Sequence, residues 1–92
     1  MSALDVLELA ATVINQRGKD YDTQTRERSG AKVAVAFTAI TGKQITAAEV
    51  YLVLQLVKDV RQWQRPRYHE DSAIDCVAYA ALKAEALDGG KQ

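Results

Sequence analysis

The sequence predicts an all-α fold, a bundle of four helices. Disorder is not expected, because 48% of the residues are hydrophobic. One Pro and five Gly leave few breaks in 92 residues, which favours long helices over short strands. Apolar residues also recur at helical spacing in four segments. The length suits one domain, residues 1–92. Its helices are expected at about residues 3–17, 25–41, 47–63 and 71–88.

The first helix is predicted from its cap and its period. Ser2 followed by Asp5 resembles a capping box, in which each residue accepts a hydrogen bond from the backbone of the other. Gly18 is a residue that can end a helix in the left-handed conformation. The apolar residues that repeat at helical spacing between them are Leu4, Leu7, Ala11 and Ile14.

Residues 18–28 are the most polar segment, and we expect them to form a loop. The two acids and one aromatic of Asp20-Tyr21-Asp22 could face a ligand, because loops held on rigid helices commonly carry function. An ordinary solvated turn is an equal alternative. The second helix has a stripe of apolar residues that Gly42 ends, and Gly30 weakens its start by roughly 1 kcal/mol.

The third helix has an unusually broad apolar arc. It begins with a second capping box, Thr46 and Glu49, and its apolar residues cover roughly 200° of the helical wheel instead of about 100°. Such a helix must be covered on two sides, so it is either central or part of a subunit interface. We therefore expect a homodimer or a larger homo-oligomer. The residues expected at its contact are Trp63, Leu52 and Leu56.

The fourth helix follows a short turn at Pro66 and should fold back antiparallel to the third. This hairpin would bring the cations Lys58 and Arg61 close to Asp71 and Asp75. Arg61 lies within the apolar arc, where a buried charge needs a carboxylate, so it should pair with one of the two acids. Tyr79 continues the face of Asp71 and Asp75 at helical spacing.

Two interpretations of this cluster stay open. In the first, the cations bind phosphate and the acids bind a sugar or a base. In the second, which is the favoured one, an ion network joins two helices and fixes their packing. For Tyr79, stacking on a base competes with a place at the edge of the core, which is the favoured interpretation.

Charge and cysteine usage exclude several classes of protein. Twelve basic and twelve acidic residues give a net charge of zero, so no overall field attracts nucleic acid or an anionic membrane. No stretch approaches the roughly 18 apolar residues of a membrane-spanning helix. Cys76 is the only cysteine and lies in an apolar helical pattern, which is typical of a buried, reduced thiol in a cytoplasmic protein.

The final helix also carries a family resemblance. The string His69-Glu70-Asp71-Ser72, with Asp75 and then Tyr79-Ala80-Ala81-Leu82, resembles the last helix of a family of small bacteriophage and prophage proteins. Other segments that match in order, within about residues 18–87, are Asp20-Tyr21-Asp22, Glu27-Arg28-Ser29, Ala36–Gly42 and Leu56-Val57-Lys58 with Arg61.

That family is in turn similar to the MazG-like all-α nucleoside triphosphate pyrophosphohydrolases. The resemblance implies a helical bundle completed by oligomerisation, a nucleotide ligand and a place in the cytoplasm of an infected or lysogenic bacterium. MazG-like enzymes hold Mg²⁺ with E-x-x-E and E-x-x-D pairs. Here Leu52 stands three residues after Glu49, and Ser72 stands three residues before Asp75.

We therefore expect a nucleotide-binding protein with weak or absent catalysis. No catalytic residue, metal ligand or cofactor is assigned, and Mg²⁺ would enter only if the chain were an enzyme. The residues expected to bind ligand are Lys58, Arg61, Asp71, Asp75, Tyr79, Asp20 and Tyr21. The alternatives are a non-enzymatic phage protein that binds a host protein or sequesters a nucleotide signal, and a structural helical adaptor.

Overall fold

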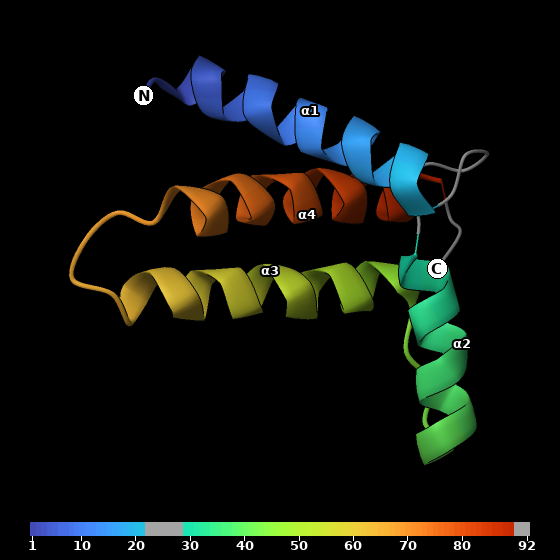
Figure 1. Cartoon of the computed structure of the whole chain (residues 1–92). Helices are drawn as coiled ribbons and strands as arrows, with labels where there is room; N and C mark the ends of the chain where they lie inside the picture. Colours follow the sequence, from blue (N-terminus) through green and yellow to red (C-terminus); the bar gives the residue numbers. More distant parts are fainter. Residues whose placement is uncertain (22–28, 90–92) are drawn as a thin grey trace.

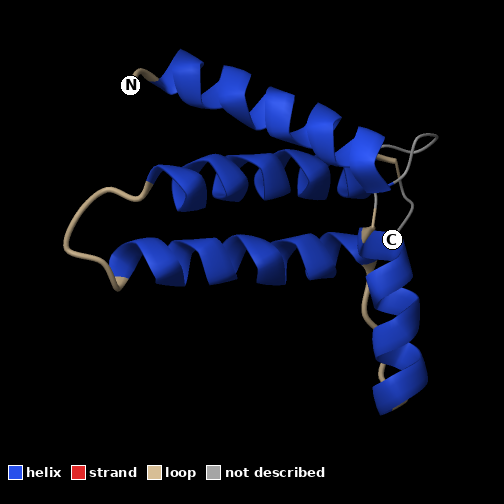
Figure 2. Ribbon diagram, in the orientation of Figure 1, coloured by secondary structure: helices blue, strands red, loops and turns tan. Residues whose placement is uncertain are grey.

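The computed structural model describes residues 1–21 and 29–89, and for residues 17–21 it describes the helical backbone alone. Every regular element in these ranges is an α-helix (Figure 2), which confirms the predicted all-α class with four helices. No described helix is both long and apolar enough to cross a lipid bilayer. The helices are α1 (Ala3–Tyr21), α2 (Gly30–Thr41), α3 (Ala47–Trp63) and α4 (Glu70–Asp88).

The helices α1, α4 and α3 lie side by side in one row, with α4 in the middle (Figure 1). The fourth, α2, packs against α3 alone among the described helices and leaves the row at a steep angle, on the side of α3 away from α4. The molecule is therefore extended, 41 × 30 × 24 Å along its principal axes. α3 packs against two helices, α4 and α2, so it too has a neighbouring helix on two sides, which is the central place that was one of the two predicted for the third helix.

Both predicted capping boxes are present. The backbone amide of Ser2 donates to Asp5 Oδ2 at 3.0 Å, and the amide of Asp5 donates to Ser2 Oγ at 3.1 Å. At the start of α3, the amide of Thr46 donates to Glu49 Oε1 at 2.8 Å, and the amide of Glu49 donates to Thr46 Oγ1 at 3.1 Å. These bonds satisfy amides that a helix start leaves without partners, and they place α3 at its predicted bounds.

The predicted end of the first helix at Gly18 is wrong, because α1 continues to Tyr21. A glycine inside a helix costs only about 1 kcal/mol relative to alanine, so it does not by itself stop one. Gly42 does end α2 as predicted, with a left-handed φ of 74° and its amide bonded to the carbonyl of Thr38. The predicted start of the second helix, residues 25–28, lies outside the described residues.

The core is built mainly from small side chains on the two sides of α4. One cluster, between α1 and α4, contains Ala10, Ile74 and Ala78. The other, between α3 and α4, contains Ala47, Tyr51 and Leu82. Small residues let the helices approach closely but bury little apolar area per residue. Much of the apolar arc of α3 lies outside both clusters: Leu56 is 52% exposed and Trp63 is 85% exposed.

Gly30 joins α2 to α3 by a close approach. Its amide donates to the hydroxyl of Tyr51 at 3.1 Å, and Tyr51 is only 3% exposed. A Cβ at position 30 would lie 2.6 Å from the nearest atom of the Tyr51 ring. The glycine that seemed to weaken the start of this helix is thus required by the ring packed against it.

We predict that Gly30→Ala destabilises the protein despite the better helix propensity of alanine. Overpacking costs about 1–3 kcal/mol, and alanine recovers at most about 1 kcal/mol. The midpoint of thermal unfolding, followed by circular dichroism, should fall by up to roughly 16 °C for a chain of this size. In a Tyr51→Leu background the same substitution should no longer lower the midpoint. An equal loss in both backgrounds would show that the ring is not the cause.

Candidate functional site

Polar side chains of α3 and α4 contact one another at several points along the interface between the two helices. Lys58 Nζ lies 3.1 Å from Asp75 Oδ2, and the thiol of Cys76 donates to Asp59 Oδ1 at 3.3 Å. One turn nearer the start of α3, Lys83 Nζ donates to Gln55 Oε1 at 2.9 Å. We call these contacts the polar seam. The predicted hairpin therefore forms, and it places Lys58 against Asp75.

The predicted ion pair between Arg61 and one of the two aspartates is wrong. Arg61 is exposed and forms no ion pair with Asp71 or Asp75 in the part of the chain that the structure describes. The reason is that the apolar arc beside Arg61 faces solvent in the single chain, so its guanidinium stays hydrated and needs no carboxylate. Lys58 is the cation that is withdrawn from water instead: its side chain and that of Asp75 are 17% and 14% exposed.

Gln62 closes the end of the hairpin. Its Nε2 donates to the carbonyl of Arg67 at 2.9 Å, and its Oε1 accepts from the amide of His69 at 2.8 Å. His69 Nδ1 lies 2.6 Å from the hydroxyl of Ser72, which is only 2% exposed. His69 is thus half-buried at the start of α4. The sequence carries no signal for these contacts, because they depend on the path of the turn.

The aromatic residues of the site lie at the end of the seam remote from the turn. Tyr79 stacks on Tyr51, with ring centroids 6.5 Å apart and an interplanar angle of 25°. It packs at the edge of the core cluster of α3 and α4, so a base would have to compete with this contact. Among the other expected ligand-binding residues, the side chains of Asp20 and Tyr21 lie outside the described structure.

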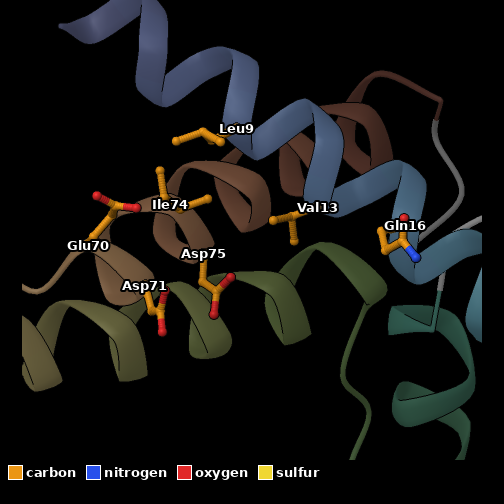
Figure 3. Close-up of a pocket in the computed structure, with 7 residues that line it drawn as sticks. All are labelled: Leu9, Val13, Gln16, Glu70, Asp71, Ile74 and Asp75. Carbon is orange, nitrogen blue, oxygen red and sulfur yellow. The ribbon is translucent and has the colours of Figure 1, made fainter. Parts of the chain in front are cut away.

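A cavity of about 430 Å³ opens between α1 and α4. Figure 3 shows Asp71 and Asp75 one turn apart on α4, on the side turned toward α3, with Gln16 projecting from α1. The sequence predicted the two aspartates but not the wall from α1, since nothing in the pattern of α1 indicates a cavity. The lining residues are Leu9, Val13, Gln16, Glu70, Asp71, Ile74 and Asp75.

Both apolar and acidic side chains line the cavity. Three carboxylates line it, and one of them, Asp75, forms an ion pair with Lys58. In the described part of the chain, no three His, Cys, Asp or Glu side chains group closely enough to hold a metal ion. Carboxylates in this arrangement can accept hydrogen bonds from ligand hydroxyl and amino groups.

The thiol of Cys76 is held in its protonated form. Burial raises its pKa to about 11, and the hydrogen bond to Asp59 and the negative charge of that carboxylate act in the same direction. A protonated thiol is a poor nucleophile, because the thiolate is the reactive species. Cys76 therefore serves the packing of the seam rather than covalent chemistry.

We predict that Cys76 reacts with iodoacetamide at pH 8 far more slowly than an unhindered thiol. Asp59→Asn should lower its pKa and speed the reaction, whereas Asp88→Asn, remote from the thiol, should not. Because the pKa of the Cys76 thiol is higher in the folded protein than its ordinary value of 9.0, the protonated thiol contributes to the free energy of unfolding. This contribution is complete below pH 9 and is lost as the pH rises toward 11. Alkylation of native protein at the rate of a free thiol would contradict this account.

Comparison with known proteins assigns the chain to a sequence family. No curated protein and no solved structure shows a significant match. One family model, described as a domain of unknown function (DUF6378), matches residues 5–87 and so includes all four helices apart from the first two residues of α1 and the last of α4. The chain belongs to this DUF6378 family.

Proposed function

We propose that the protein is a nucleotide-binding protein of phage or prophage origin that acts in the bacterial cytoplasm without hydrolysing its ligand. In this proposal it is a reduced relative of the MazG-like pyrophosphohydrolases, and its bundle is completed by a further copy. The observation that carries the ligand site is the cavity between α1 and α4, which apolar side chains and carboxylates line together.

The volume and the lining of the cavity suit a nucleoside. About 430 Å³ lies within the range of 300–1,000 Å³ that small-molecule sites commonly have. A base can pack against Leu9, Val13 and Ile74, while Asp71 and Gln16 accept hydrogen bonds from amino or hydroxyl groups. The carboxylates of Glu70 and Asp71 would repel a phosphate group placed inside the cavity, so the phosphates must lie outside it.

Cations on α3 provide the place for those phosphates. Lys58 contacts Asp75 and therefore lies at the rim of the cavity. Arg61 follows one turn later on the same helix, toward the end of α3 that meets the start of α4. Its exposed guanidinium, which forms no ion pair among the described residues, can bind phosphate with two parallel hydrogen bonds.

The carboxylates of this chain do not fit the Mg²⁺ site of the MazG-like enzymes. Asp75 is neutralised by Lys58, and an oxygen of Glu49 is already bonded to the backbone at the start of α3. Glu49 also lies nine residues before Lys58, about 14 Å along the helix axis. We therefore assign no hydrolytic step to the chain.

We predict that nucleotides stabilise the protein in a thermal-shift titration, with and without Mg²⁺, because a ligand of the folded state raises the unfolding midpoint. Arg61→Ala should weaken binding of a nucleoside triphosphate by roughly tenfold or more, the loss of a charged hydrogen bond, and should leave binding of the free nucleoside unchanged. Asp71→Asn should weaken both ligands.

Arg65→Ala is the matched control, since it removes an exposed Arg that follows α3 and is not assigned to the site. It should leave both affinities unchanged. If no nucleoside or nucleotide shifts the midpoint, the cavity is not a nucleotide site. Steady release of pyrophosphate that Asp75→Asn abolishes would establish an enzyme instead.

A further inference from the structure

The side of α3 opposite the polar seam carries a continuous apolar stripe. Val53, Leu56, Val60 and Trp63 follow one another at intervals of three, four and three residues, the spacing of a helix that packs against another helix. All four are exposed in the single chain. The residues of the seam, by contrast, lie on average about a third of a turn, roughly 130°, away around the same helix.

The exposed area is larger than a chain of this mass normally leaves in water. The accessible surface is 6426 Å², about 1,100 Å² more than the roughly 5,300 Å² expected for a folded monomer of 10.1 kDa. Stable complexes bury about 800 Å² on each partner. The surplus is therefore enough for one interface of ordinary size.

We propose that a second copy of this chain covers the stripe, and that the two α3 helices pack antiparallel about a two-fold axis near Leu56. In this arrangement Val53 of each copy meets Val60 of the other, and Leu56 meets Val57. The stripe is then complementary to itself, as a two-fold interface requires.

The charges at the ends of α3 favour the antiparallel direction. Glu49 lies in the first turn, and Arg65 follows the last one. Antiparallel packing sets the acid of one copy beside the arginine of the other at both ends of the interface. It also pairs the opposite ends of the two helix dipoles, whereas parallel packing would align like ends.

In this dimer, the steep angle between α2 and α3 provides a contact surface for the second copy. α2 and α3 form a corner at the N-terminal end of α3, on the side away from α4 (Figure 1). The two-fold axis brings Trp63 of the second copy to that end, where it can pack into the corner. The most exposed large side chain of α3, Trp63 at 85%, would be covered there.

Sedimentation of the full chain across a range of concentrations tests the assembly. We expect a dimer whose only tryptophan fluoresces as a buried indole, with a shift to longer wavelength on dilution. Leu56→Glu should weaken self-association by roughly 30-fold or more, the effect of losing a central contact. The control Leu4→Glu makes the same change at an exposed position on α1, on the far side of α4, and should leave the dimer intact.

A monomer at high micromolar concentration would overturn the proposal and leave the stripe to a different protein. A dimer that Leu56→Glu does not weaken would also overturn it. If circular dichroism shows that Leu56→Glu is unfolded, the proposal is tested by disulfide cross-linking instead. The cysteine variants used for cross-linking leave the stripe largely apolar.

For that experiment Val53→Cys and Val60→Cys are prepared separately in a Cys76→Ser background. Antiparallel packing separates identical positions by about 10 Å along the axis, too far for a disulfide, but brings position 53 opposite position 60. Only the mixture of the two variants should then form a disulfide dimer on oxidation. Dimers of either variant alone, or no cross-link in the mixture, would overturn the antiparallel arrangement.

Discussion

The polar seam between α3 and α4 is the contact on which the rest of the structure depends. Lys58–Asp75, Asp59–Cys76 and Gln55–Lys83 all lie on one face of α3, so that face is turned toward α4. Polar groups withdrawn from water need such partners, because an unmatched one costs about 1–3 kcal/mol. The rotation of α3 about its axis is set by this requirement, and its apolar stripe is turned outward as a consequence.

The small side chains of the core reinforce this arrangement. Ala47, Ala48 and Ala78 allow close helix contacts, yet they leave α4 covered by α1 on one side and by α3 on the other without a further layer. A row one helix thick buries too little apolar surface for a chain of this size. The outward stripe of α3 and the projecting α2 are where the missing burial can be regained.

The same seam shapes the chemistry of the candidate site. It neutralises Asp75 with Lys58 and keeps the Cys76 thiol protonated, so both groups are engaged in packing. What remains is an acidic cavity beside α1 and an exposed Arg61 one turn beyond the seam. The proposed nucleotide site rests on these two features.

By itself, the sequence determined the features that act over a few residues. Capping boxes at Ser2 and Thr46, the left-handed Gly42 and the hairpin that faces Lys58 toward Asp75 follow from local spacing and helix geometry. Helical periodicity shows which residues share a face, but it does not say what covers that face. Only the tertiary structure decided that α4 is central, that Gly30 makes room for Tyr51, and that Arg61 remains in water, because each depends on the packing of side chains distant in the sequence.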